Sequence, residues 1–312
     1  MFKNLVLISF ISLPLASENL LDIYNEALDN DPQYKSSEYS LLAGKEFVVQ
    51  GRAGLLPNVT LSGSTNWNEY YQFDELQSSY NNNSVTARLT QPLFRLDSWF
   101  NFKRSKKLTD ASEADFAYAQ QNLIIRTVEK YFGVLRAIDN LNAAISEEKA
   151  IKKQLDQIQQ RFEVGLSAIT EVQEAQLAYD LSLAAKIRSE GALFNAREEL
   201  NSLIGREIFS VDSLKADIVP ENPNPTTKQE WVDIALKNNY RLQASVLRRD
   251  ASQDSARSSA SEHLPKINIV GTESESNTNQ YTYEGFEDLG FQAPSETQRK
   301  NYSLSLSIPI SQ

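Results

Sequence analysis

The side chains that could carry out nucleophilic, acid–base or metal chemistry are few in this sequence. The chain has no cysteine and a single histidine, His263, which excludes thiol nucleophiles, disulfides and multi-histidine metal sites. His263 directly precedes a Leu-Pro pair at the end of a helical pattern, and we interpret it as a structural or exposed residue. The sequence therefore predicts no catalytic residue, no metal site and no cofactor.

The charged residues are interpreted as solvated side chains rather than as a reaction centre. Glu147 and Glu148 fall on a polar helix face, and Glu273 and Glu275 fall near a predicted loop. The basic run KRSKK at 103–107 balances neighbouring acids, and no glycine-rich phosphate loop is present. A formal charge of −10 argues against a general nucleic-acid binder, which needs a basic surface. We predict that the protein is not an enzyme and binds no nucleic acid.

A repeated sequence block determines how the chain must be organised. LLPNVTLSG at 55–63 is matched by HLPKINIVG at 263–271, 208 positions later, and the alignment needs no gap over about 45 residues. SVTARLTQPLF at 84–94 then resembles NYSLSLSIPIS at 301–311. Each block follows a helical pattern that stops at Leu-Pro, because proline disfavours helical geometry in the residue before it. The sequence predicts an internal duplication.

The repeated blocks alternate polar and apolar residues with a period of two, which is typical of strands. The polar positions that would line a pore are Thr60, Ser62, Ser64, Thr86, Arg88, Ser303, Ser305 and Ser307. The apolar face is expected to end in aromatic residues, namely Trp67, Tyr70, Tyr71, Tyr80, Tyr281, Tyr283 and Tyr302. This pattern fits an outer-membrane β-barrel. The alternative is a soluble antiparallel sheet that packs its apolar face on helices.

Four predicted strands are too few to close a barrel around a lumen, and unpaired strand edges in lipid are very costly. If the strands cross the membrane, several copies of the chain must share one barrel. Three copies would supply twelve strands.

A long helical hairpin is predicted at 99–203. The chain has no proline from Trp99 to Phe162, and its apolar residues recur every three or four positions in a coiled-coil-like pattern. At 1.5 Å per residue such a helix extends about 95 Å. Gly165 is expected to end it in a left-handed conformation, and Ser167 or Thr170 to cap the returning helix.

The whole chain is predicted to divide into four regions. Residues 1–17 are expected to be a secretory signal peptide. The first repeat is expected at 18–217, a proline-rich linker at 218–229, and an incomplete second repeat at 230–312. The predicted fold class is an α+β membrane protein with an outer-membrane β-barrel shared between protomers, long periplasmic coiled-coil hairpins and internal duplication.

These motifs together resemble the TolC family of outer-membrane efflux proteins. The resemblance covers 18–312 and is most specific at RFEVGLSAITEVQEAQ, 161–176. It implies a homotrimer in outer-membrane lipid that serves efflux or type I secretion, with a periplasmic adaptor and an inner-membrane pump or ABC exporter as partners. The residues that the resemblance assigns to adaptor docking are Arg161, Phe162, Gly165, Leu166 and Ser167. It assigns Thr170 and Glu171 to an entrance gate, with Glu171 where an aspartate is familiar in the family.

Two further expectations concern completeness and an alternative function. The second repeat stops three residues after Pro309, so a second helical hairpin is expected to be missing and the sequence to be part of a longer protein. The alternative function is a soluble periplasmic adaptor or scaffold built on the helical hairpin.

Overall fold

The computed structural model describes residues 18–214, 222–278, 281–282 and 295–309. The predicted signal peptide, Tyr283 and part of the predicted linker lie outside these residues. The chain divides into two compact units. Unit 1 comprises the chain up to Tyr39 together with Phe116–Asn238, and unit 2 comprises Ser40–Asp115 together with the chain from Asn239 onward.

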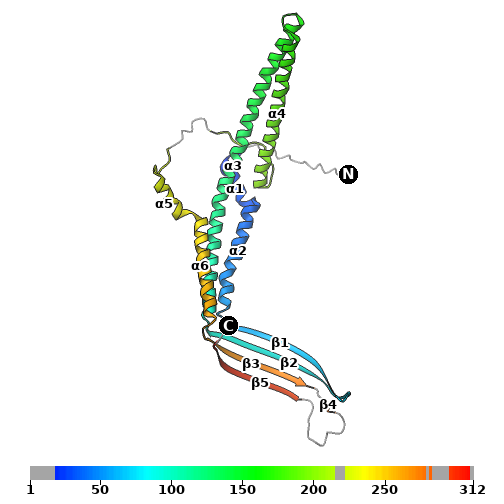
Figure 1. The fold of residues 1–312 in the computed structure, drawn as a ribbon, viewed down its shortest axis with the longest axis vertical. Helices are drawn as coiled ribbons and strands as arrows, with labels where there is room; N and C mark the ends of the chain where they lie inside the picture. Colours follow the sequence, from blue (N-terminus) through cyan, green and yellow to red (C-terminus); the bar gives the residue numbers. More distant parts are fainter. Residues whose placement is uncertain (1–17, 215–221, 279–280, 283–294, 310–312) are drawn as a thin grey trace, which may run out of the picture. The chain divides into compact units, whose positions relative to one another are not determined.

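The order of the elements is helix, helix, strand, strand, long helical hairpin, and then helix, helix and strands again (Figure 1). The elements before the hairpin are α1 (Leu20–Asn30), α2 (Pro32–Ala53), β1 (Asn58–Gln72) and β2 (Glu75–Phe94). The hairpin consists of α3 (Leu96–Glu163) and α4 (Ile169–Ile204). The elements after it are α5 (Lys228–Asn238), α6 (Tyr240–Ser261), β3 (Lys266–Thr278), the short β4 (Tyr281–Thr282) and β5 (Ser295–Ser307).

The helix breaks fall at corresponding places in the two halves of the sequence. The side chain of Asp31 accepts a hydrogen bond from the backbone N–H of Tyr34 at 2.9 Å, and Pro32 begins α2. The side chain of Asn239, 208 positions after Asp31, accepts from the N–H of Leu242 at 3.0 Å. Both side chains satisfy a backbone donor that the first helical turn leaves without a partner. The same local chemistry therefore starts α2 and α6.

The core of unit 1 is formed by α1, α3 and α4. Ile23 and Ala27 of α1 are fully buried, and they belong to a hydrophobic cluster with residues from α3 and α4. The other buried members of the cluster are Leu123, Tyr131, Val134, Ala137, Leu193, Leu200, Leu203, Ile204 and Ile208. Arg206 follows α4 and pairs through its guanidinium with Glu26 at 2.6 Å and with Glu18 at 2.8 Å. Apolar burial and these ion pairs hold α1 against the base of the hairpin.

The helices of unit 2 pack through small residues. Gly44 and Gly51 of α2 are buried, and the hydroxyl of Thr109 in α3 donates to the carbonyl of Gly44 at 2.9 Å. A Cβ atom at Gly51 would lie 2.6 Å from the Cβ of Ser105, which real structures do not tolerate. Ala244 and Ala251 supply the buried apolar residues of α6. The absence of side-chain bulk lets the helix backbones approach closely.

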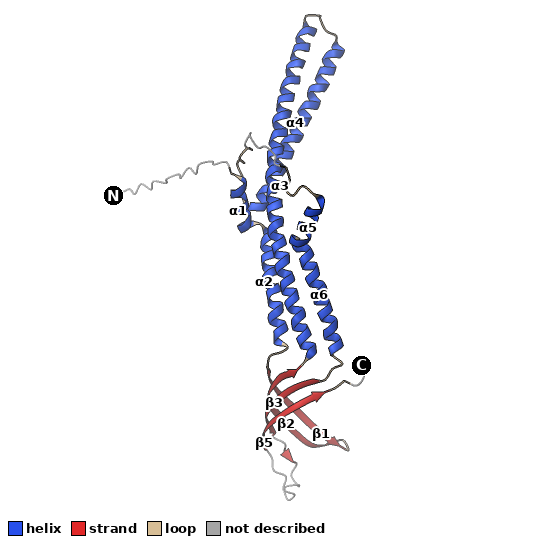
Figure 2. Ribbon diagram, turned by 90° about the vertical axis from the view of Figure 1, so that its left-hand side faces the viewer, coloured by secondary structure: helices blue, strands red, loops and turns tan. Residues whose placement is uncertain are grey.

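The strands of unit 2 form one antiparallel sheet in the order β1-β2-β3-β5 (Figure 1), and β4 pairs with β2. Figure 2 draws the strands in red and the helices in blue. Fifteen residues of β1 pair with β2 in a register that joins Val59 to Leu89 and Ser62 to Thr86. Strand β3 joins the two halves of the sequence, because it pairs with β2 on one side and with β5 on the other.

Candidate functional site

The strand register gathers the predicted pore-lining residues on one face of the sheet. Thr60 pairs with Arg88, and Ser62 pairs with Thr86. On the other side of the sheet, Arg88 pairs with Thr272, which in turn pairs with Asn301. Because residues directly opposite each other point to the same face and alternate along each strand, all eight predicted positions share this face. We call it the polar face.

The same register gathers apolar residues on the opposite face, which we call the apolar face. Its members include Val59, Leu61, Leu89, Ile269, Tyr302, Leu304 and Leu306. Leu61 is 75% exposed and Leu304 is 67% exposed. The alternative of a soluble sheet whose apolar face packs on helices is therefore wrong. An exposed apolar surface of this extent marks contact with lipid or with another protein.

The prediction that Tyr70 and Tyr80 belong to the aromatic residues of the apolar face is wrong. Trp67 and Tyr302 lie on the apolar face, but Tyr80 pairs with Asn68 and Tyr70 pairs with Ser78, which places both on the polar face. The pairing shifts between Tyr70 and Tyr71. That shift does not explain the two errors, because the alternation from Thr60 to Tyr70 and from Tyr80 to Arg88 is unbroken and already assigns both tyrosines to the polar face.

The tip of the helical hairpin has the turn that the sequence predicts. Gly165 has a φ of 78°, in the left-handed region. Its N–H donates to the carbonyl of Phe162 at 2.9 Å, and the N–H of Leu166 donates to the carbonyl of Arg161 at 2.8 Å. These bonds use carbonyls that the end of α3 would leave unpaired. Phe162 is 41% exposed and Leu166 is 70% exposed, so the tip presents apolar side chains.

The predicted cap of the returning helix is wrong. Ala168 occupies the N-cap position of α4 and makes no side-chain cap bond, and Thr170 lies inside the first turn. Ser167 instead donates its hydroxyl to the carboxylate of Glu171. Glu171 does lie in the first turn of α4, where the helix dipole favours a negative charge. Thr170 and Glu171 are thus neighbours at the tip.

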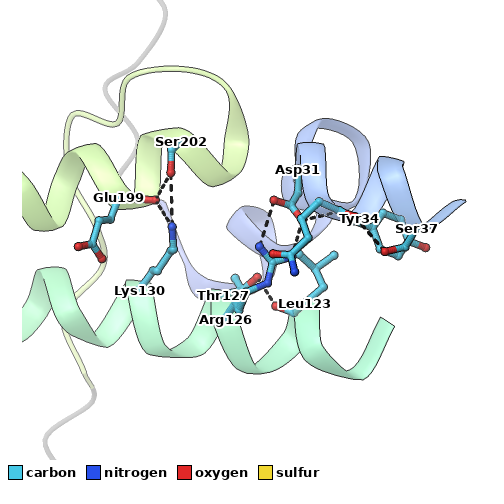
Figure 3. Close-up of polar contacts among 10 residues, drawn as sticks. Asp31, Tyr34, Ser37, Leu123, Arg126, Thr127, Lys130, Glu199 and Ser202 are labelled. Atoms are coloured by element: carbon cyan, nitrogen blue, oxygen red, sulfur yellow. Dashed lines mark hydrogen bonds and ion pairs between the residues drawn. The ribbon is translucent and has the colours of Figure 1, made fainter. Parts of the chain in front are cut away.

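A buried ion pair at the start of α2 was not anticipated from the sequence. Arg126 of α3 pairs with Asp31 through two hydrogen bonds, one of them 3.2 Å between Nη1 and Oδ1 (Figure 3). The Asp31 side chain is 4% exposed and that of Arg126 is 21% exposed. Figure 3 also shows Lys130, whose ammonium donates to the carbonyl of Glu199 at 2.7 Å. The 95 positions between Asp31 and Arg126 left no local signal for the pair.

Asp97 organises the junction between the sheet and the helices of unit 2. Arg95 donates to it through two atoms, at 2.9 and 2.7 Å, and Lys266 at the start of β3 lies 3.3 Å away. The hydroxyl of Ser258 in α6 donates to the backbone carbonyl of Asp97 at 2.8 Å. The hydrogen bonds from Arg95 hold the pKa of Asp97 well below its usual range. Sequence spacing could have suggested the Arg95 pairing, but not the contacts from Lys266 and Ser258.

Over the residues that the structure describes, no group of three or more histidine, cysteine or acidic residues is arranged to hold a metal ion. His263 lies in the exposed turn after α6. Within the same residues, none of the helices combines the length and the apolar character needed to cross a membrane.

Comparison with known proteins identifies the class. The family model of the outer membrane efflux proteins matches residues 23–206, more than half of the chain. Outer membrane protein TolC of Vibrio cholerae is 33% identical over 261 residues, covering 84% of this chain and 59% of the relative. TolC of Escherichia coli is 31% identical over 318 residues, covering 99% and 62%. The crystal structure of the Campylobacter jejuni CmeC outer membrane channel superposes with a TM-score of 0.74 at 17% identity, over 95% of this chain and 62% of that one.

The chain therefore belongs to the outer membrane efflux protein family. The predicted fold class is confirmed, because the fold is that of solved outer-membrane channels. The predictions of an outer-membrane location and of a protein that is not an enzyme are likewise confirmed by the family. The chain spans about 60% of the length of the curated relatives that it matches.

Proposed function

We propose that this chain is part of an outer-membrane exit duct for efflux or type I secretion. The observation that carries the proposal is the segregation of the sheet into a polar face and an exposed apolar face, which the registers of β1, β2, β3 and β5 establish. A sheet with this alternation can place its apolar face in lipid and its polar face on a water-filled passage. Family membership favours this function over the soluble adaptor.

We further propose that three copies share the barrel. Strands β1 and β5 are the edges of the described sheet, and each presents backbone donors and acceptors that lipid cannot satisfy. A second and a third copy would pair β5 of one protomer with β1 of the next. The closed sheet would then have no free edge.

The repeat organisation is part of the proposal. Corresponding caps at Asp31 and Asn239 support a first repeat at 18–217 and a second at 230–312, joined by 218–229. Each repeat would supply two long strands to the shared barrel.

The hairpin tip is proposed as the docking point for a periplasmic adaptor, which would connect the duct to an inner-membrane pump or ABC exporter. Phe162 and Leu166 are exposed on either side of the turn at Gly165, and they form an apolar surface at the tip. Thr170 and Glu171 would gate the entrance nearby. Their hydroxyl and carboxylate can form polar links to a neighbouring coil.

Oligomeric state in detergent tests the duct. The full chain, expressed with its own signal segment and extracted from outer membranes, should migrate as a trimer in unheated gel samples and as a monomer after boiling. A freely water-soluble monomer would contradict the proposal.

Substitution of Gly165 by leucine tests the tip separately. A side chain at φ 78° strains the turn, so Gly165→Leu should weaken pull-down of the adaptor at least severalfold while the trimer still assembles. Gly191→Ala is a matched control, because a Cβ there meets no atom within 4 Å. Loss of membrane insertion in Gly165→Leu, with adaptor binding retained by what is inserted, would refute the placement of the tip.

A further inference from the structure

The charged residues of the sheet are distributed unequally between its two faces. On the polar face, the charged side chains where β2, β3 and β5 pair with one another are Arg88, Lys266 and Arg299, and none of these is acidic. Glu75, opposite Gln72 near the β1–β2 turn, is the acidic residue of this face among the described residues and lies outside that part of the sheet. The charged side chains of the apolar face are Glu69, Glu273, Glu275, Glu296 and Lys300. The chain as a whole carries a formal charge of −10. Where β2, β3 and β5 pair, the polar face is thus basic although the protein as a whole is acidic.

The two arginines of the polar face lie close enough to act together. Arg88 is on β2, in the row of Thr272 and Asn301, and Arg299 is on β5, in the next row, opposite Ser274. One strand separates them, so the strand and row spacings place their backbones about 12 Å apart. Both side chains are exposed. Neither guanidinium has a hydrogen bond or ion pair within the part of the chain that the structure describes.

The other cations of the sheet each have an acidic partner, although Lys266 shares its partner with Arg95. Lys300 on the apolar face lies 2.7 Å from Glu273, and Lys266 lies 3.3 Å from Asp97. A charge in an ion pair produces little electrostatic field at a distance, whereas the fields of two unpaired charges of the same sign add. Arg88 and Arg299 are therefore the cations of the described strands that have no acidic partner, and both lie on the polar face.

We propose that Arg88 and Arg299 make the polar face an anion-attracting zone, so that the barrel passage favours anionic solutes over cationic ones. This inference rests on the proposed function, because it assumes that the polar face lines the passage. Low-dielectric walls focus such a field and raise the local concentration of counter-ions. With three copies around the passage, six guanidinium groups would surround the permeating species and select it by charge rather than by shape.

A single introduced cysteine can report this potential without any need for conduction. The chain has no cysteine, so Ser274→Cys creates one thiol, directly opposite Arg299 and diagonal to Arg88. Its rates of modification by an anionic sulfonatoethyl and a cationic trimethylammonioethyl methanethiosulfonate are measured on the trimer in detergent. Each rate is divided by the rate for a free small thiol. The anionic reagent should be favoured by about fivefold or more at low salt, and the preference should vanish in 1 M salt.

Charge-matched variants in this background identify the source of the potential. Arg88→Gln and Arg299→Gln should each lower the preference by about twofold or more, while Lys300→Gln, which removes the same charge from the apolar face, should leave it unchanged. Equal rates, a preference for the cationic reagent, or an effect of Lys300→Gln as large as that of the arginines would overturn the inference. A thiol that neither reagent can modify would overturn it as well, because the polar face would not be open to water.

Conductance separates this inference from the proposed function. In a planar bilayer with a KCl gradient, the Arg88→Gln/Arg299→Gln variant should shift the reversal potential in the cation-selective direction relative to the unsubstituted chain. Channels without this shift would leave the duct standing and refute the anion zone. If no channels form, the proposed function as an exit duct is contradicted. The rates of thiol modification would still show whether the polar face has a positive potential.

Discussion

Arg126 and Asp31 show how one residue pair can fix two helices of unit 1. Asp31 serves two purposes, since its carboxylate caps α2 and accepts from the guanidinium of Arg126 on α3. A carboxylate that is only 4% exposed is stable there because it is fully partnered. The pair therefore holds the start of α2 against α3 within unit 1.

Removal of the arginine should be costly. Arg126→Met leaves Asp31 buried without its charge partner, and we expect a loss of about 3–5 kcal/mol in the free energy of unfolding. Arg248→Met is the control, because its pair with Asp115 is exposed on both sides and should contribute less than about 1 kcal/mol. Denaturant unfolding followed by circular dichroism compares them. Equal losses in both variants would contradict the structural role of the buried pair.

Contacts between whole helices in unit 2 depend on glycine rather than on large apolar side chains. Gly51 of α2 faces Ser105 and Phe102 of α3, and a Cβ atom there would lie 3.3 Å from the Phe102 Cα. The neighbouring backbone cannot move aside as a flexible side chain would. Close packing of this kind is sensitive to a single added methyl group.

Alanine substitution should therefore change the free energy of unfolding differently at a buried and at an exposed glycine. Gly51→Ala should lower the free energy of unfolding by about 1–3 kcal/mol. Gly191→Ala in α4 should leave it unchanged or raise it by up to about 1 kcal/mol, because alanine favours the helix and the site is open. Thermal unfolding of the two variants provides the measurement. A stabilised Gly51→Ala protein would show that α2 and α3 do not pack this closely.

The junction of strands and helices at Asp97 should give unit 2 a dependence on acid. The pKa of Asp97 is lowered in the folded protein, so its contribution to stability is complete above the ordinary aspartate pKa of about 4 and decreases as the pH falls further. The difference in unfolding midpoint between the unsubstituted chain and Asp97→Asn should be largest at pH 7 and shrink below about pH 4. Asp250→Asn, in a more exposed pair with Arg249, is the control. A difference that stays constant down to pH 2 would be the contrary result.

The whole molecule depends on keeping the two faces of the sheet in different surroundings. Leu61 and Ser62 are adjacent in the chain but lie on opposite faces, since they pair with Ala87 and Thr86 respectively. Lysine facing the hydrocarbon costs about 2–4 kcal/mol per site near the midplane, whereas a pore-facing lysine remains hydrated. Adjacent positions therefore make a sensitive test of orientation.

We expect Leu61→Lys to reduce the amount of chain inserted into outer membranes severalfold, and Ser62→Lys to leave insertion near normal. Membrane fractionation and the heat-sensitive trimer band measure the outcome. The reverse ranking would mean that the polar face meets lipid, and the duct would then have to be abandoned.

Local patterns in the sequence predicted the elements, and the resemblance to a known family predicted the class of protein. The period of two predicted the four long strands, and the proline-free, heptad-like run predicted the hairpin. The glycine at position 165 predicted a left-handed turn, and its φ is 78°. Such features depend on near neighbours in the chain, and the physical forces that produce them act over a few residues. For the same reason the eight predicted polar positions share one face of the sheet, while their place along a pore stays a prediction.

Only the tertiary structure decided which distant residues meet. The pairs Arg126–Asp31 and Lys266–Asp97 join positions that no local pattern relates, because ion pairing depends on distance in space and not along the chain. The irregularity in pairing after Tyr70 and the cap at Ala168 also escaped prediction, since cross-strand pairing and helix starts depend on the geometry of the folded turn. Strand registration alone brought Arg88 and Arg299 into neighbouring rows of one face, because β3 lies between their strands.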